Sequence, residues 1–331
     1  MTARPRVFVS RALPGDPTPA SAERIDWDIW ERDEAPSPAE LRARAASRDG
    51  LLSMLTDRID SALLDACPEL RVVSQMAVGY DNIDVAACTA RGVAVCNTPG
   101  VLTDATADYT FALLLAAARR VVEGDRVVRA DGWKAWHPTF MLGRDVSGAT
   151  LGIVGMGSIG AAVAHRAVGF GMRILYHSRG DHLDVEQTTG ARRVPFSTLL
   201  SESDFVIALV PLTPETRRLF GAAEFALMKP TAVFVNVARG PVVDEAALVQ
   251  ALRAGRPGSA ALDVFEQEPL PSGHPLTALP NVVLSPHLGS ASWGARTAMA
   301  RMAVENAVAA LTGAEPRAIV NPETLGGAAH G

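Results

Sequence analysis

The segment LGIVGMGSIG contains the feature that most restricts the fold of this chain. Gly155, Gly157 and Gly160 form the pattern G-x-G-x-x-G, with an apolar run before it and a helix-forming stretch after it. The first glycine of such a pattern permits a tight turn, the second lets the backbone approach a pyrophosphate, and the third lets the helix pack closely on the strand. The helix start at Ser158 and Ile159 then directs free N–H groups toward the phosphates. The segment therefore predicts a strand, a turn and a helix that bind a dinucleotide.

The next expected strand, within ILYHSRGDH, ends in residues that bear on the kind of nucleotide. In the common version of this unit an acidic residue at the strand end holds the ribose 2′-hydroxyl. Here the strand ends at His177, Ser178 and Arg179, and the acids Asp181 and Asp184 come too late. Arginine offers a planar fork of donors that suits a phosphate, and serine adds a hydroxyl. The strand end favours NADP(H), with NAD(H) still possible; the alternative is a solvated loop that happens to be basic.

Expected strands alternate with expected helices along most of the chain, which is typical of parallel sheets covered on both faces. Before residue 100 the strands are RVFVS, LLSML, RVVSQM and VAVCN. After the glycine motif they are MRILYH, DFVIALV, AVFVNVA, SAALDV and VVLSP. Between the two series, one long helix is expected from Thr103 to Asp131, with more apolar residues than one face holds. One of its faces could meet a second subunit, or the helix could be buried within its own chain.

Length, charge and cysteine usage exclude several classes of protein. The chain has 331 residues, which suggests roughly two domains, and its formal net charge of -5 argues against a general nucleic-acid binder. No apolar run is long enough for a bilayer, and no secretory signal segment is evident. The cysteines, Cys67, Cys88 and Cys96, are widely spaced and odd in number, which fits reduced thiols. We expect a cytoplasmic protein that binds no membrane, no nucleic acid and no metal.

Polar residues with chemical potential follow three expected strands. Arg239 follows AVFVNVA, Asp263 and Glu268 follow SAALDV, and His287 follows VVLSP. Taken singly, the arginine could hold a surface carboxylate and the histidine could cap a helix. However, ligands of open parallel sheets bind at the carboxyl ends of the strands, where the dinucleotide loop also lies. Together these residues predict one reaction site.

Several stretches resemble the D-isomer-specific 2-hydroxyacid dehydrogenases. They are VGYDNIDVAACTARGVAVCNTPG, VLTDATAD, GIVGMGSIG, PLTPETRRLF, NVARGPVVDEAAL, ALDVFEQEP and SPHLGSAS. The resemblance runs from about Val7 to Asn321 and is nearest to the glyoxylate/hydroxypyruvate reductases. One departure is Gly100, which replaces the first aspartate of the relatives' pattern Asn-Thr-Pro-Asp-Val-Leu-Thr-Asp. Because this position is near the expected hinge, domain closure is the property that the departure affects.

The resemblance implies an α/β fold of two doubly wound parallel-sheet domains. A flavodoxin-like substrate domain would comprise residues 1–100 and 287–331. An NAD(P)-binding Rossmann domain would comprise residues 101–286 and would be inserted in it. The resemblance also implies a homodimer.

Matching motif positions give the roles that the resemblance implies. Arg239 would hold the substrate carboxylate and polarise the keto oxygen, His287 would be the general acid, and Glu268 would hydrogen-bond His287. The backbone at Val78 and Gly79 would hold the substrate carboxylate.

Further contacts with the coenzyme and the substrate follow. Asp263 would face the nicotinamide amide. The implied coenzyme contacts are Thr106, Gly155, Gly157, Ser158, Ile159, Gly160, His177, Ser178, Arg179, Pro211, Thr216, Ala238, Asp263, His287 and Gly289. We expect the substrate between the two domains, with the bulky Leu102 and Trp293 as candidates for its wall, although either could merely pack.

The expected chemistry follows from the charge that the reaction develops. Hydride addition to a 2-keto acid builds negative charge on the carbonyl oxygen, which a proton donor and a fixed cation stabilise. Glu268 beside His287 should favour the protonated imidazole. Arg239 can bind a carboxylate through two parallel hydrogen bonds and so orient the carbonyl. The leading expectation is NADPH-dependent reduction of glyoxylate and hydroxypyruvate to glycolate and D-glycerate.

Two other functions stay open at this point. One is phosphite dehydrogenase or another D-2-hydroxyacid dehydrogenase, although an inorganic dianion would favour a lysine near AVGYDN, where this chain has Val78. The other is a nucleotide-sensing binding module like the C-terminal-binding-protein corepressors, which share this fold. Such sensors bind NAD(H) and carry an acid at the strand end, which this chain lacks.

Overall fold

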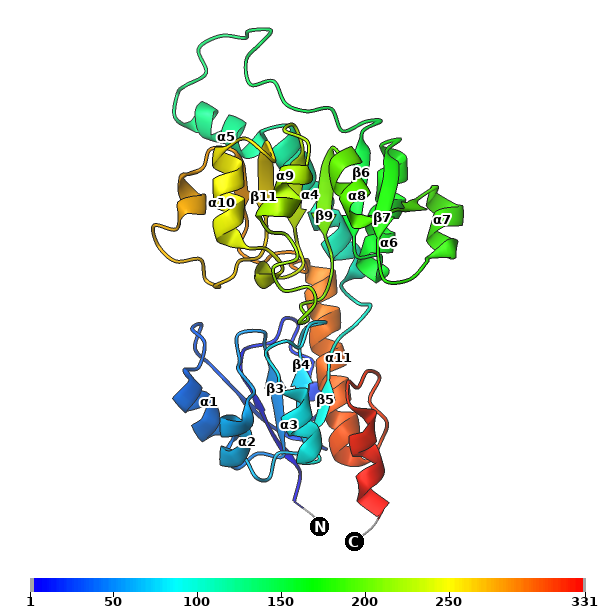
Figure 1. The fold of residues 1–331 in the computed structure, drawn as a ribbon. Helices are drawn as coiled ribbons and strands as arrows, with labels where there is room; N and C mark the ends of the chain where they lie inside the picture. The colour runs from blue at the N-terminus through cyan, green and yellow to red at the C-terminus, as the bar shows by residue number, and fades with distance from the viewer. Residues whose placement is uncertain (1–2, 330–331) are drawn as a thin grey trace. The chain divides into compact units, whose positions relative to one another are not determined.

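The computed structural model describes residues 3–329 and contains two compact units (Figure 1). Unit 1 comprises Met1–Leu102 and Ala291–Gly331, and unit 2 comprises Thr103–Ser290. The boundaries expected from the sequence are after residues 100 and 286. The structure instead divides the chain after Leu102 and Ser290, so His287 belongs to unit 2.

Unit 1 is built on a five-stranded parallel sheet in the order β2-β1-β3-β4-β5, which is the flavodoxin-like order. Its strands are β1 (Arg6–Val9), β2 (Asp26–Ile29), β3 (Gly50–Ser53), β4 (Val72–Gln75) and β5 (Ala94–Cys96). Its helices are α1 (Pro38–Ala45), α2 (Ser61–Ala66), α3 (Val85–Ala90) and α11 (Trp293–Thr312). Apolar side chains of α1, α2 and α3 share one core with the sheet, while α11 packs on β3, β4 and β5.

Unit 2 is built on a seven-stranded parallel sheet in the order β12-β11-β10-β9-β6-β7-β8. Its strands are β6 (Thr150–Val154), β7 (Arg173–His177), β8 (Arg192–Arg193), β9 (Phe205–Ala208), β10 (Val233–Asn236), β11 (Ser259–Leu262) and β12 (Val282–Leu284). Counted from β6, this is the dinucleotide-binding order 3-2-1-4-5-6 with one further strand. The expected fold class, two doubly wound parallel-sheet α/β units, is confirmed.

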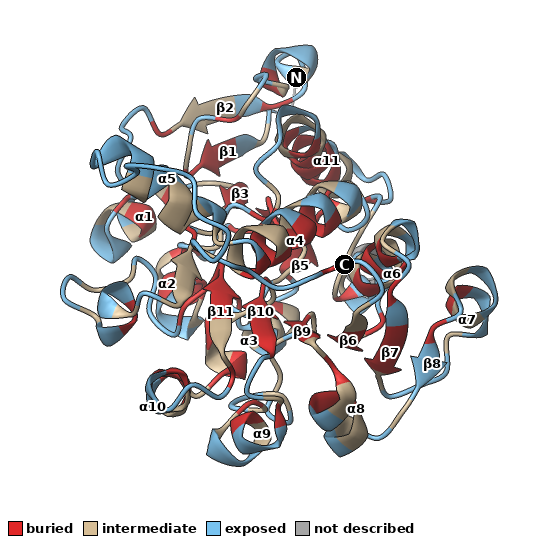
Figure 2. Cartoon of the chain, turned by 90° about the horizontal axis from the view of Figure 1, so that it is seen from above, coloured by how far each residue is buried: buried red, intermediate tan, exposed pale blue. Residues whose placement is uncertain are grey.

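Helices cover both faces of the sheet of unit 2, as the apolar runs of its strands require. On one face lie α4 (Thr103–Ala118) and α6 (Ser158–Gly169), and on the other α8 (Phe196–Glu202), α9 (Ala222–Leu227) and α10 (Glu245–Arg253). The remaining helices are α5 (Val121–Arg129) and α7 (Leu183–Thr189). Figure 2 shows β10 as buried, in agreement with the burial of all its residues.

The single long helix expected from Thr103 to Asp131 is wrong, because the structure has two helices, α4 and α5, in this region. The chain turns at Arg120, whose φ of 54° is left-handed and ends a right-handed helix. The backbone N–H of Arg144 donates to the Ala118 carbonyl at 2.7 Å, so a returning segment takes this acceptor. Much of α4 is buried within unit 2, whereas α5 has no buried residue.

The three cysteines, Cys67, Cys88 and Cys96, are free thiols and are buried. Burial raises the pKa of these thiols to about 11, 11 and 12, so they stay protonated at neutral pH.

Within residues 3–329 no helix is long and apolar enough to cross a membrane. In the same residues no group of three or more His, Cys, Asp or Glu side chains could hold a metal ion.

Candidate active site

Three neighbouring strands of unit 2 carry the expected reaction residues beyond their carboxyl ends. Arg239 follows β10, Asp263 and Glu268 follow β11, and His287 follows β12. These strands are adjacent and parallel, so their carboxyl ends share one edge of the sheet. The dinucleotide loop after β6 lies at the same edge, two strands from β10. The fold thus gathers residues that are far apart in the sequence.

His287 and Glu268 form a direct pair. The Nδ1 atom of His287 lies 2.6 Å from Oε2 of Glu268, and the side chains are 29% and 35% exposed. The other carboxylate oxygen of Glu268 accepts the Phe265 N–H at 3.1 Å, which fixes the carboxylate in place. A carboxylate on Nδ1 keeps the proton on that nitrogen and leaves Nε2 to face a reactant.

The pKa of Glu268 is lowered from its ordinary value although burial acts in the opposite direction. Burial is the largest effect and raises this pKa, because it penalises the charged form. The hydrogen bond and charge of His287, the Phe265 N–H and the charge of Arg239 together outweigh burial. Glu268 is therefore ionised at neutral pH and supports a positive charge on the imidazole.

Asp263 fixes the loop that carries His287. Its side chain is 1% exposed, and its oxygens accept the Ser285 hydroxyl at 2.6 Å and the Leu288 and Gly289 N–H groups at 2.7 and 2.8 Å. His287 itself has a left-handed φ of 57°, which a non-glycine residue adopts only when its surroundings hold it there. The aspartate supplies that restraint from within the protein. Its expected contact with the nicotinamide amide stays a prediction.

Arg239 is placed by an unusually close approach of two loops. A Cβ on the next residue, Gly240, would lie 1.8 Å from the carbonyl carbon and oxygen of Phe265, so only glycine fits. The Arg239 side chain is half-buried, its Nη1 donates to the Ala238 carbonyl at 2.9 Å, and its own carbonyl accepts the Asn236 side chain at 3.0 Å. The loop of Arg239 is thereby packed against the loop of Glu268.

Glu245 supports the same loop and is a residue that the sequence analysis missed. It opens α10, is 7% exposed, and accepts the backbone N–H of Glu266. Its Oε2 atom lies 3.4 Å from Nε2 of His274. Burial raises the pKa of Glu245 above its ordinary value. A signal was present in the sequence: Asp244 already caps α10, so the adjacent acid Glu245 is available for another contact.

The glycine loop after β6 fits a dinucleotide. Gly155 has a φ of 104°, and a Cβ on it would lie 2.7 Å from the carbonyl of Leu209. A Cβ on Gly160 would lie 2.3 Å from the Gly155 carbonyl oxygen. A Cβ on Gly157 would meet no protein atom within 4 Å, and no side chain caps α6 at this residue. The first and third glycines thus close the loop, and the second leaves room and free N–H groups for a pyrophosphate.

The residues at the end of β7 divide into two kinds. The His177 ring packs at 5.4 Å on the Phe196 ring, and its Nδ1 lies 3.2 Å from the Val194 carbonyl oxygen, so it takes part in internal packing. Arg179 is exposed, and Ser178 is half-buried with its hydroxyl on the Gly180 carbonyl. Of the expected set, the arginine is thus the one most open to a ligand.

Further residues that the resemblance assigns to the coenzyme also lie in unit 2. The hydroxyl of Thr216 donates to the Pro211 carbonyl at 2.6 Å, so both belong to one turn after β9. Thr106 is buried in α4, and a Cβ on Gly289 would lie 3.5 Å from its methyl group. Their contacts with a coenzyme stay predictions.

The expected substrate contacts Val78, Gly79, Leu102 and Trp293 lie in unit 1. The carbonyl of Val78 accepts the Asn97 side chain at 2.9 Å. Leu102 is 7% exposed and Trp293 is 82% exposed. Their contact with substrate stays a prediction.

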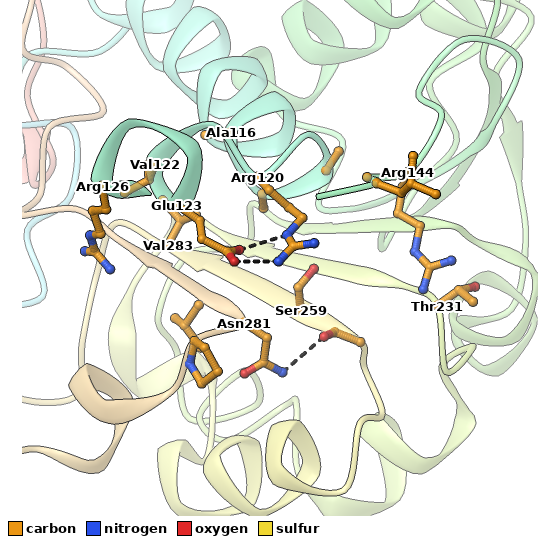
Figure 3. A pocket seen from close by; sticks show the side chains of 17 residues that line it. Ala116, Arg120, Val122, Glu123, Arg126, Arg144, Thr231, Ser259, Asn281 and Val283 are labelled. Atoms are coloured by element: carbon orange, nitrogen blue, oxygen red, sulfur yellow. Dashed lines mark hydrogen bonds and ion pairs between the residues drawn. The ribbon is translucent and has the colours of Figure 1, made fainter. Parts of the chain in front are cut away.

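A pocket of about 680 Å³ lies elsewhere in unit 2 and is not this site (Figure 3). It is lined by Thr231, Ser259 and Val282, at the amino ends of β10, β11 and β12. Figure 3 shows Arg120 paired with Glu123 beside it. The expected reaction residues lie at the opposite, carboxyl edge of the same strands.

Comparison with known proteins places the chain in a family. Residues 111–289 match the profile of the D-isomer specific 2-hydroxyacid dehydrogenase NAD binding domain. A glyoxylate reductase of Korarchaeum cryptofilum is 53% identical over 323 residues, with 97% of each chain covered.

Solved structures agree with this assignment. A protein of Thermus thermophilus has a TM-score of 0.90 and 47% identity, with 95% of this chain and 99% of that chain covered. An NADPH-dependent glyoxylate/hydroxypyruvate reductase of Sinorhizobium meliloti, in complex with NADP and malonate, has a TM-score of 0.83 and 33% identity, with 96% and 97% covered. The chain therefore belongs to the D-isomer specific 2-hydroxyacid dehydrogenase family.

Proposed function

We propose that this protein is an NADPH-dependent reductase that converts glyoxylate to glycolate and hydroxypyruvate to D-glycerate. The observation that carries the proposal is the 2.6 Å pair of His287 and Glu268, with the charge of Arg239 acting on it, at the sheet edge that bears the dinucleotide loop. Two glyoxylate reductases that are 53% and 50% identical support the substrate. An NADPH-dependent relative in complex with NADP supports the coenzyme.

The residues divide the chemistry among themselves. When bound, the reduced nicotinamide supplies a hydride to the keto carbon. Arg239 binds the substrate carboxylate and orients the carbonyl, which brings the reacting groups together. His287 donates the Nε2 proton to the carbonyl oxygen as the negative charge develops there. Glu268 holds Nδ1 and stabilises the imidazolium before that transfer.

The preference for NADPH rests on the end of β7. No acidic residue occupies the position that would bind a ribose 2′-hydroxyl, and Ser178 and Arg179 stand there instead. The Arg179 guanidinium forms no hydrogen bond within residues 3–329. The hydrogen bond of the Thr213 side chain is the main cause of the lowered pKa of Glu215, and the nearby charge of Arg179 adds to it. A 2′-phosphate would give this guanidinium a partner of stronger charge.

The proposal also specifies small keto acids as the substrates and a homodimer as the oligomeric state. The motif positions of Val78, Gly79, Leu102 and Trp293 are the basis for assigning them to the substrate. A homodimer is supported by the segment 121–142 of unit 2, which exposes several large apolar side chains: Val121, Val128, Trp133, Trp136, Phe140 and Leu142. Such a patch is typical of a protein interface.

The experiment that tests the proposed function is a steady-state panel of 2-keto acids with NADPH and NADH. Glyoxylate and hydroxypyruvate should give the highest kcat/KM, above phenylpyruvate and 2-ketoisocaproate, since pocket contacts discriminate by about 1–3 kcal/mol per methylene. NADPH should be preferred by roughly ten- to a hundredfold, the effect of about 1.5–3 kcal/mol from one charge-assisted contact. The variant Arg179→Ala should raise the KM for NADPH and leave that for NADH unchanged.

Other results of the panel would contradict specific parts of the proposal. An optimum at a branched or aromatic keto acid would remove the assignment to glyoxylate and hydroxypyruvate but not the family. Equal use of both coenzymes by the unaltered protein would remove the NADPH preference. Binding of the coenzyme with no turnover of any keto acid would favour a nucleotide-sensing module instead.

A further inference from the structure

The side chain of Arg193 holds the loop that follows β7, residues 178–181, through three hydrogen bonds, which together we call the clamp. Its Nη2 donates to the carbonyl oxygens of Ser178 and Arg179 at 3.0 and 3.1 Å, and its Nη1 donates to Oδ1 of Asp181 at 2.8 Å. One planar guanidinium thus donates hydrogen bonds to three of the four residues of this loop. The planar fork of an arginine suits this geometry, and the single ammonium of a lysine does not. The loop is otherwise exposed at Arg179, Gly180 and Asp181.

The clamp reaches the loop because β8 pairs with β7 at the edge of the sheet, where Figure 2 shows the two strands side by side. In this pairing Arg193 is opposite Tyr176, near the end of β7. Successive side chains of a strand point to opposite faces, so Arg192 faces away from Arg193. The side chain of Arg192 is exposed and forms no hydrogen bond or ion pair within residues 3–329, so Arg192 is a suitable control that carries the same charge without these contacts.

The clamp also determines which polar groups of the loop remain available to bind a ligand. The carbonyl oxygens of Ser178 and Arg179 are turned toward Arg193, so these acceptors are directed to a cation of the protein. The side chain of Arg179 is left exposed, without a hydrogen bond within the described residues. Carbonyl oxygens repel a phosphate and a guanidinium attracts one, so this arrangement suits an anionic group.

We propose that Arg193 is a positioning residue for coenzyme selection, which holds the carbonyls of Ser178 and Arg179 away from the 2′-phosphate and presents the Arg179 side chain to it. The inference rests on the proposed preference for NADPH and deepens it. The discrimination between NADPH and NADH then depends on an edge strand remote in sequence from the glycine motif. Without the clamp the loop keeps Ser178 and Arg179 but loses their fixed orientation.

The experiment measures the dissociation constants of NADPH and NADH by calorimetry for the unaltered protein and for Arg193→Ala, Arg193→Lys and Arg192→Ala. Arg193→Ala should weaken NADPH binding about tenfold, the equivalent of one charge-assisted hydrogen bond, and change NADH binding less than twofold. Arg192→Ala removes the same charge one residue away and should leave the ratio of the two constants unchanged. Arg193→Lys keeps the charge without the fork and should resemble Arg193→Ala.

Each outcome is decisive because NADH binding reports on the fold of every variant. If Arg193→Ala gives the same ratio as Arg192→Ala, the clamp has no role in selection and the inference is overturned. If Arg193→Lys keeps the ratio of the unaltered protein, charge alone is sufficient and positioning is overturned. A lack of preference in the unaltered protein would overturn the NADPH part of the proposed function, whatever the variants do.

Discussion

At the scale of single residues, the site depends on which nitrogen of His287 is engaged. Glu268 bonds Nδ1 at 2.6 Å, so in the proposed reaction Nε2 is the nitrogen that gives a proton. The pKa of Glu268 is lowered, so its carboxylate is charged at neutral pH and stabilises the imidazolium there. The lowered pKa of Glu268 means that its charged form also stabilises the folded protein. This stabilisation of the fold is fully present above the ordinary pKa of a glutamate and is lost as the pH falls through the lowered pKa of Glu268.

The variant Glu268→Gln tests this pair. In the proposed mechanism the imidazole must be protonated, so the rate of reduction should fall once the imidazolium loses its proton. Without the carboxylate the imidazolium is less stable, and the upper limb of the kcat/KM profile should move to lower pH. The measurement is kcat/KM for glyoxylate with saturating NADPH from about pH 5 to 9. A profile that coincides with that of the unaltered protein would count against the pair.

The residue types of the site could be inferred from the sequence, but the internal contacts could not. Arg239, Glu268 and His287 each follow a recognisable buried strand, and parallel strands present their carboxyl ends together. The contacts of Asp263 with the Leu288 and Gly289 N–H groups depend on how the loop after β12 folds back. No periodic pattern in the sequence encodes such a contact.

At the scale of secondary-structure elements, the apolar strands were predictable, the edge strands β5 and β12 among them, but the edge strands β2 and β8 were not. β6, β9, β10 and β11 are apolar runs buried on both faces. β2 has the sequence DWDI with no buried residue, and β8 consists of two exposed arginines. Edge strands of this kind form through pairing with a neighbour, so their own residues carry no apolar signal.

The close approach of two loops at Gly240 can be tested by a single substitution. In Gly240→Ala the new Cβ would lie 1.8 Å from the Phe265 backbone, so the loops of Arg239 and Glu268 must move apart. We expect a loss of about 3 kcal/mol or more of unfolding free energy, since backbone cannot yield as a flexible side chain does. A fall in kcat should accompany this loss.

The matched control is Gly169→Ala at the end of α6, where a Cβ would meet nothing within 4 Å. It should change the unfolding free energy by less than about 1 kcal/mol. The measurement is urea denaturation together with kcat for both variants. Equal stabilities of the two variants would show that the close approach at Gly240 has no energetic role.

At the scale of the whole molecule, we expect a homodimer formed through the segment 121–142. Trp136 and Leu142 are 78% and 66% exposed, and several large apolar side chains exposed in one segment favour a protein interface. Light scattering at micromolar protein should give twice the chain mass of 34.9 kDa. The double variant Trp136→Ser with Phe140→Ser should shift the protein toward the mass of one chain. A single-chain mass for the unaltered protein would refute the prediction.

The proposed reduction depends on one proton donor, a histidine of unit 2. The most direct test is the kcat of His287→Ala with glyoxylate and NADPH, measured together with the dissociation constant of NADPH. The control is His165→Ala, which removes an exposed histidine of α6. We expect kcat to fall by about 10²–10⁴ in His287→Ala while NADPH still binds, and we expect His165→Ala to keep the kcat of the unaltered protein. A His287→Ala enzyme whose kcat stays within a factor of about three of the unaltered protein would contradict it.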